Sequence, residues 1–223
     1  MDWIEFWTIC SANGIVLEKE QIDDIKRYAG ELQKWNKKVN LISRKDQENI
    51  PVRHILHSLS VLKYFKIPHR SYCLDVGTGG GLPGIPISIA RPDLHILLID
   101  SIAKKIKVTK MLADHTGRKN LSAKCIRAED LTSEKKHRYR YDFIFARDVK
   151  RLERVLDWVK PLMKNDAKVI FYKGGNLDMA MVIAASLILF VAMFTGKRRS
   201  LERWEGALLL VFYAVYLVYL VST

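Results

Sequence analysis

The stretch SYCLDVGTGGGLPGIPISIA, residues 71–90, decides the fold of this chain. A short apolar run leads into a glycine-rich turn, and a second apolar run follows directly. Gly77, Gly79 and Gly81 allow the backbone to turn tightly and let a ligand approach without meeting a Cβ atom. The amides at the start of a following helix would point toward that ligand. The stretch therefore predicts a strand, a ligand-binding turn and a helix, in that order.

The rest of this region alternates between apolar runs and helical patterns. Further apolar runs fall at 94–100, 121–126, 141–146 and 167–173, and helical patterns fall at 102–115 and 152–163. The runs lack the apolar–polar alternation of half-exposed strands, which is typical of strands buried on both faces. We therefore predict an α/β domain over residues 71–176, with a parallel Rossmann-like sheet and helices on both faces.

The segment before this domain is helical in pattern. Helices are predicted at 2–13, from after Leu17 to about residue 42, and at 49–65. The apolar positions of the second helix step by three and four, which indicates one buried face; they are Ile22, Ile25, Tyr28, Leu32, Trp35, Val39 and Ile42. Residues 1–70 are therefore predicted to form an N-terminal helical cap.

Two carboxylates accompany the glycine turn. Asp100 ends the run at 94–100, where a carboxylate can accept hydrogen bonds from both ribose hydroxyls of a nucleoside. Asp75 lies two residues before Gly77, which gives the acid-x-Gly-x-Gly-x-Gly pattern of methyltransferases. In that reading Asp75 serves the amino-acid end of S-adenosylmethionine, and the adenosine lies near Asp100, Ala128 and Glu129.

A dinucleotide site is the competing interpretation of the turn. Gly79, Gly81 and Gly84 match the G-x-G-x-x-G pattern formally. Pro83 interrupts that match, so the methyltransferase pattern fits better. An NAD-type oxidoreductase remains an alternative.

Charge and cysteine content narrow the function classes. The chain carries 37 Lys and Arg against 24 Asp and Glu, a net charge of +13. Residues 177–223 hold four cations and three acids, so twelve of these charges belong to residues 1–176. Such a basic domain is typical of polyanion binders.

The three cysteines are scattered and form no C-x-x-C pair, so the sequence predicts neither a disulfide scaffold nor a metal site. The N-terminal MDWIEFWTIC lacks the basic start of a signal peptide, so a cytoplasmic location is expected.

Seven motifs together resemble one protein family. They are WNKKVNLIS (35–43), VRHILHSL (52–59), CLDVGTGGGLPGIPISIARPD (73–93), LLIDSIAKKIKVTK (97–110), RAEDL (127–131), YDFIFARDV (141–149) and FYKGG (171–175). Over about residues 1–176 the chain resembles the RsmG (GidB) family, bacterial methyltransferases that modify guanine N7 in 16S rRNA. The resemblance implies a class I methyltransferase fold, S-adenosylmethionine as cofactor, and 16S rRNA or the small ribosomal subunit as partner.

The resemblance also implies roles for individual residues. The family's cofactor contacts fall on Gly77, Leu82, Ala128, Glu129 and Arg147. Guanine N7 has an in-plane lone pair and no proton to lose, so the reaction needs no general base. We therefore predict no catalytic side chain, only Arg147 as a candidate for positioning the nucleotide or the cofactor. Asp148 beside it and His57, an Asp in many relatives, depart from the family pattern. Candidate RNA contacts are the cations and histidine Arg53, His54, Lys104, Lys105, Lys107, Arg138 and Arg140.

The composition changes after residue 176. Residues 179–195 and 206–223 are uncharged and apolar, and the basic stretch GKRRSLERWE separates them. Residues 179–221 resemble the last two membrane helices of bacterial sodium/calcium exchangers, where family members normally continue with a helix and two strands. A cytosolic first domain would place the basic turn outside, against the positive-inside rule. We therefore interpret 177–223 as a foreign tail that allows membrane association. A membrane-anchored or non-functional fusion product is an alternative function, and the soluble form is expected to be a monomer.

Overall fold

The computed structural model describes residues 2–43, 49–147 and 152–172. The chain divides into the units Met1–Lys173 and Gly174–Thr223, and every described residue belongs to the first. The predicted tail hairpin and Asp148 therefore lie outside the described residues. None of the helices in the described ranges is long and apolar enough to cross a membrane.

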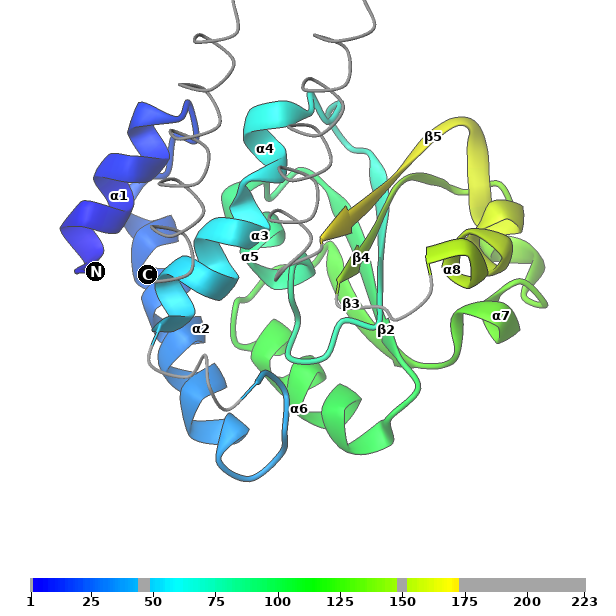
Figure 1. The fold of residues 1–223 in the computed structure, drawn as a ribbon, viewed down its shortest axis with the longest axis horizontal. Helices are drawn as coiled ribbons and strands as arrows, with labels where there is room; N and C mark the ends of the chain where they lie inside the picture. Colours follow the sequence, from blue (N-terminus) through cyan, green and yellow to red (C-terminus); the bar gives the residue numbers. More distant parts are fainter. Residues whose placement is uncertain (1, 44–48, 148–151, 173–223) are drawn as a thin grey trace, which may run out of the picture. The chain divides into compact units, whose positions relative to one another are not determined.

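In the described residues, five parallel strands form a sheet in the order β3-β2-β1-β4-β5 (Figure 1). They are β1 (Tyr72–Val76), β2 (His95–Asp100), β3 (Leu121–Cys125), β4 (Tyr141–Arg147) and β5 (Met163–Tyr172). The parallel α/β prediction is thus confirmed. The order reverses between β1 and β4, and in such sheets ligands bind beyond the carboxyl ends of the strands at this point. The glycine turn follows β1 at that end.

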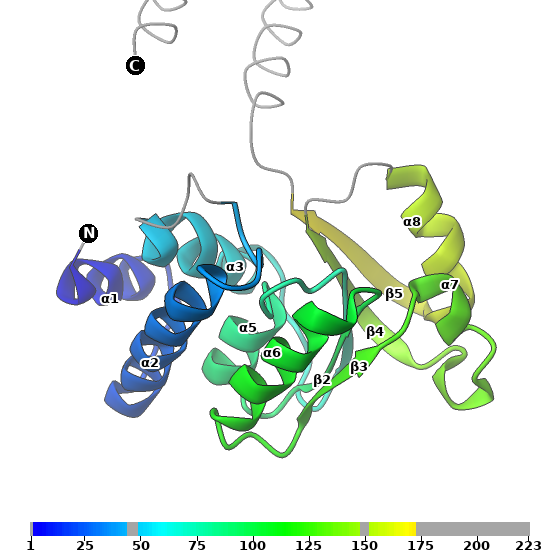
Figure 2. The same ribbon diagram turned by 90° about the horizontal axis from the view of Figure 1, so that it is seen from below.

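Helices cover both faces of the sheet (Figure 2). One face packs against α5 (Gly84–Ala90) and α6 (Ala103–Asp114), and the other against α7 (Ala128–Leu131) and α8 (Leu152–Val159). Successive strand residues point to opposite faces, so Cys73 belongs to the core beneath α5 while Leu74 belongs to the core beneath α8. This double burial explains the continuous apolar runs that form β1, β2 and β4.

Where the structure describes it, the N-terminal cap is helical. Its segments are α1 (Trp3–Ala12), α2 (Lys19–Asn36), the π-helix η2 (Ile50–Leu56), α3 (His57–Leu59) and α4 (Val61–Tyr64). The Asp2 carboxylate caps α1 by accepting from the Glu5 amide at 2.7 Å. Apolar cap residues such as Phe6, Ile25 and Leu32 are buried in the same core as α5 and β2.

Three predicted helices and one predicted strand had wrong bounds. β5 begins at Met163, four residues before the strand predicted at 167–173. Helix α2 ends at Asn36, because the Asn36 side-chain oxygen accepts from the Leu41 and Ile42 amides at 2.7 and 2.9 Å and holds a turn there. The helix predicted at 49–65 is broken into η2, α3 and α4. The helix predicted at 152–163 ends at Val159, and a 3-10 turn (Lys160–Leu162) leads directly into β5.

Candidate functional site

The glycine turn has a backbone that only glycine adopts without strain. Gly77, Gly79 and Gly81 have φ angles of 71°, 56° and 98°. A Cβ atom on Gly81 would lie 2.3 Å from the Ile85 side chain, and one on Gly84 would lie 2.2 Å from the Leu98 side chain. The start of α5 therefore packs directly on the turn and on β2, which fixes the end of β1 in place.

Side chains from two other helices hold the carbonyls of this turn. The Tyr28 hydroxyl on α2 donates to the Gly80 carbonyl at 3.0 Å. The Thr109 hydroxyl on α6 donates to the Gly79 carbonyl at 2.6 Å. Both side chains are buried. The cap and α6 thus support the turn directly, a role that the apolar helix patterns did not predict.

Asp75 is fully buried at the end of β1. Its Oδ2 accepts from the Thr78 hydroxyl at 2.7 Å and from the Gly84 amide at 2.9 Å. Its Oδ1 is also buried and finds no hydrogen-bond partner among the described residues. Burial raises the pKa of Asp75 to about 7, against the lowering effect of the Thr78 and Gly84 hydrogen bonds. A buried acceptor without a donor is costly, so Oδ1 favours a ligand that brings one.

Asp100 ends β2 and is only 8% exposed. Its Oδ2 accepts from the Gly79 amide at 3.1 Å, and its Oδ1 accepts from the Ile102 amide at 2.9 Å. These two bonds fix the carboxylate, and each oxygen keeps a second lone pair for a ligand. Asp100, as predicted, can therefore accept further hydrogen bonds from a ligand at the carboxyl end of the sheet.

A cavity of about 280 Å³ lies beside Asp100. Four predicted cofactor residues line it together: Gly77, Asp100, Ala128 and Glu129. Six further residues complete the lining: Val76, Ile99, Ser101, Ile126, Arg127 and Trp158. Trp158, on α8, was not predicted as a site residue. In the sequence, a tryptophan at helical spacing indicates only core packing. The predicted residues Asp75, Gly79, Gly81, Leu82 and Arg147 do not line this cavity.

Arg147 joins the sheet to the cap. It ends β4, and its Nη2 lies 2.6 Å from His54 Nδ1 and 3.2 Å from the Arg53 carbonyl. A guanidinium only donates, so Nδ1 of His54 must accept, which leaves that imidazole neutral with its proton on Nε2. The Arg147 charge also lowers the pKa of Asp75. The predicted positioning residue thus lies between the glycine turn and η2.

The predicted RNA contacts fall on three separate elements. Lys104, Lys105 and Lys107 belong to α6, Arg53 and His54 to η2, and Arg138 and Arg140 to the segment before β4. His54 is only 4% exposed, so the expectation that its ring contacts RNA does not fit its burial against Arg147. The Arg138 guanidinium donates to the Thr132 carbonyl at 2.8 Å and remains exposed.

A parallel sheet with a glycine turn after its first strand and a carboxylate after its second, both beside one cavity, defines a Rossmann-like nucleoside-binding protein. The model of the family described as rRNA small subunit methyltransferase G matches residues 21–192. The chain belongs to this family. The match continues past residue 176, where the resemblance was expected to end, and thus includes the first part of the predicted foreign tail.

Individual relatives agree with this assignment. A ribosomal RNA small subunit methyltransferase G from Chlorobium phaeobacteroides is 37% identical over 174 residues, which cover 78% of this chain and 76% of the relative. One from Flavobacterium psychrophilum is 39% identical over 163 residues, covering 70% and 75%. Among solved structures, a precorrin-6y C5,15-methyltransferase from Geobacter metallireducens superimposes with a TM-score of 0.45 and 15% identity, over 66% of this chain and 72% of that one.

Proposed function

We propose that this chain transfers a methyl group from S-adenosylmethionine to N7 of a guanine in 16S rRNA. Its membership in the small subunit methyltransferase family supports the reaction class and the substrate. The observation that carries the cofactor assignment is the cavity on which Gly77, Asp100, Ala128 and Glu129 converge. These residues come from three separate segments of the sequence, and the sequence predicts a cofactor contact at each of them.

The residues at this end of the sheet fit the cofactor. The fixed carboxylate of Asp100 would hold the ribose hydroxyls, and Ala128 and Glu129 would border the adenine. The orphaned Oδ1 of Asp75 would accept from the amino group of the methionine end, directly or through a water molecule. When bound, the cofactor supplies a methyl group already activated by its sulfonium charge.

The protein then has to position the target rather than activate it. Guanine N7 carries a free lone pair and no proton, so catalysis depends on holding that nitrogen in line with the methyl group. We assign Arg147 as a positioning residue, since it ends β4 next to β1 and ties η2 to the sheet. Removing it would release η2 from the end of β4. In this assignment no side chain acts as a general base.

The basic charge of the domain fits an RNA substrate. Twelve net positive charges on residues 1–176 favour binding to a phosphate backbone. The substrate places the enzyme in the cytoplasm, and we infer that residues 1–176 act as a monomer with the cap 1–70 and the sheet domain 71–176. For residues 177–223, the exchanger resemblance and membrane association through 179–221 stay predictions.

The decisive experiment is methyl transfer to unmodified small-subunit RNA with S-adenosylmethionine, followed by mass mapping of the product. We expect 7-methylguanosine at one position. Methyl groups on a base amine or on a ribose would contradict the assignment. Titration with S-adenosylhomocysteine and separately with NADH tests the cofactor: binding of NADH alone would favour the oxidoreductase alternative.

A further inference from the structure

A second cavity lies at the opposite end of the strands from the cofactor cavity. It measures about 320 Å³, at the lower end of the range for small-molecule sites. Its lining includes Tyr72 and His95, the first residues of β1 and β2, whereas the cofactor cavity is lined by Val76 and Asp100, the last residues of the same strands. The two ends of β2 are about 17 Å apart, from a rise of about 3.3 Å per residue. The two cavities are therefore separate.

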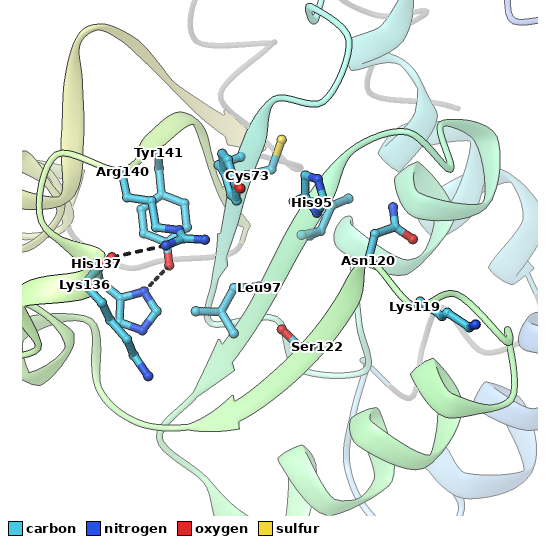
Figure 3. Close-up of a pocket in the computed structure, with 12 residues that line it drawn as sticks. Cys73, His95, Leu97, Lys119, Asn120, Ser122, Lys136, His137, Arg140 and Tyr141 are labelled. Carbon is cyan, nitrogen blue, oxygen red and sulfur yellow. Dashed lines mark hydrogen bonds between the residues drawn. The ribbon is translucent and has the colours of Figure 1, made fainter.

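The cavity exists because the connection from β3 to β4 contains little helical structure to cover the sheet. Between these strands the chain forms only the single helical turn α7 and the 3-10 turn η3 (Lys135–His137). Neither covers the first halves of β2 and β3, so half-buried Leu97 and exposed Ser122 form a floor of strand residues. Figure 3 shows this floor between two walls, with Arg140, Lys136 and His137 on one side and Lys119 on the other.

The charged side chains that line this cavity are all positive. Its lining contains Lys119, Lys136 and Arg140 and no carboxylate. Within the described part of the chain, no acid lies at ion-pair distance from Lys119 or Arg140, and Lys136 pairs only with Glu134, at 3.5 Å. Glu134 is already shared with Lys124 and His137. Burial lowers the pKa of His137, which disfavours the charged form of its ring. The walls thus present two uncompensated cations and a third that is partly compensated.

Flat side chains line the same cavity. The rings of Tyr72 and His95 stack with centroids 4.9 Å apart and planes 18° from parallel. The Arg140 guanidinium lies over the Tyr72 ring, 4.4 Å from its centroid. The His137 and Tyr141 rings are parallel within 6° and share a hydrogen bond of 2.7 Å, but both are buried. The half-buried rings of Tyr72 and His95 are therefore the ones that a base could contact. Cations interleaved with flat rings are the combination with which proteins bind single-stranded nucleic acid.

We propose that a single-stranded segment of the rRNA crosses this cavity, with one phosphate near Arg140 and Lys136 and another near Lys119. This proposal rests on the proposed function and adds a second RNA contact at the far end of the sheet from the transferred methyl group. It gives a role to Arg140, which the sequence analysis lists among the candidate RNA contacts. It also adds Lys119 to those contacts, although no sequence motif indicates this residue. The segment bound here lies a few nucleotides away from the target guanine.

The test compares two double variants in full-length protein. Lys119→Gln with Arg140→Gln removes the two uncompensated cations. Lys19→Gln with Lys26→Gln removes the same charge from exposed positions on α2, which packs on the other face of the sheet. The probe is a labelled single-stranded oligonucleotide of 16S rRNA sequence around the methylated guanine, titrated at several salt concentrations.

The expected result is a selective loss of RNA affinity. Each lost phosphate contact lowers the slope of log affinity against log salt by about 0.7, so the cavity variant should lose about 1.4, equivalent to about 25-fold weaker binding at about 0.1 M salt. The control variant should keep the slope of the unmodified protein. S-adenosylhomocysteine affinity should be unchanged in both variants, and the KM for RNA should rise in the cavity variant without a change in kcat.

Three results would overturn the proposal, and they are distinguishable. Equal RNA binding by the two variants, with methyl transfer intact, removes the cavity from the RNA path while the proposed function stands. Binding of adenosine monophosphate that the cavity variant loses, without any change in RNA affinity, assigns the cavity to a free nucleotide instead. If the unmodified protein neither binds the oligonucleotide at any salt concentration nor methylates small-subunit RNA, the proposed function is overturned together with the cavity.

Discussion

Replacing Asp100 with alanine should weaken cofactor binding far more than it weakens the fold. The carboxylate is fixed by the Gly79 and Ile102 amides and retains one free lone pair on each oxygen for the two ribose hydroxyls. A hydrogen bond to a charged group contributes about 1.5–3 kcal/mol. Two such bonds at the lower limit give about 3 kcal/mol, which corresponds to about 150-fold weaker binding of S-adenosylhomocysteine.

Calorimetric titration measures this loss directly, and thermal melting of the same sample reports the fold. Asp114→Ala is the matched control, because Asp114 is an exposed carboxylate at the end of α6. That variant should bind S-adenosylhomocysteine as tightly as the unmodified protein. A folded Asp100→Ala variant with unchanged affinity would refute the reasoning and remove Asp100 from the site.

A chemical control separates a direct contact from a distorted turn, because Asp100 also accepts from the Gly79 amide. The ligand is S-adenosylhomocysteine without its ribose 2′-hydroxyl. It should bind the unmodified protein more weakly than the complete ligand does, by about 1.5 kcal/mol or more. It should bind Asp100→Ala as well as the complete ligand does. If removal of the hydroxyl costs the same in both proteins, Asp100 acts only through the turn.

Three further predictions concern the turn, the buried carboxylate and the tail. Tyr28→Phe should lower the free energy of unfolding by about 1–3 kcal/mol, because the buried Gly80 carbonyl loses its donor; urea denaturation measures the change, and an unchanged midpoint would contradict it. The pKa of Asp75 is raised to about 7 in the folded protein, so the ligand-free protein should lose stability as pH rises from about 4 to about 7, and Asp75→Asn should flatten that dependence in thermal melts; an identical pH profile would show that Asp75 does not titrate in this range. The full-length protein should aggregate or partition into membranes, and replacing residues 176–223 with the C-terminal segment of a soluble relative should restore a monomer that binds cofactor. Deleting 176–223 alone should help less, since β5 is an edge strand among the described residues and an open edge pairs with other chains. A soluble, monomeric and fully active unmodified chain, assessed by light scattering and methyl transfer, would show that the tail is an ordinary part of the protein.

The centre of the sheet could be predicted because β1, β2 and β4 are largely buried on both faces. Strands such as β2 and β4 read as unbroken apolar runs, and Asp100 is conspicuous as the acid that ends one of them. Glycines in a turn after the first run indicate close backbone approach, which the contacts of Gly81 and Gly84 bear out. At these residues the sequence pattern and the burial in the folded protein agree.

The contacts that connect distant segments could not be predicted. Arg147 contacts His54, which lies 93 residues earlier in the sequence, and nothing in either residue type indicates that pairing. Val39 and Ile42 continue the apolar period of α2 although the helix ends at Asn36, because the turn after the helix buries its own side chains. The cavity at the start of the strands depends on how little chain covers β2 and β3, a property of the packed fold.

The shared core of the cap and the sheet has a consequence for cooperativity. Cap residues such as Phe6 and Ile25 and sheet residues such as Leu98 and Phe145 are members of one continuous apolar cluster. A cluster of this kind is expected to unfold as a unit, so we expect the cap and the sheet to unfold together. We expect residues 1–173 to unfold in a single calorimetric transition, and we expect a fragment that begins at residue 71 to lack a native state of its own.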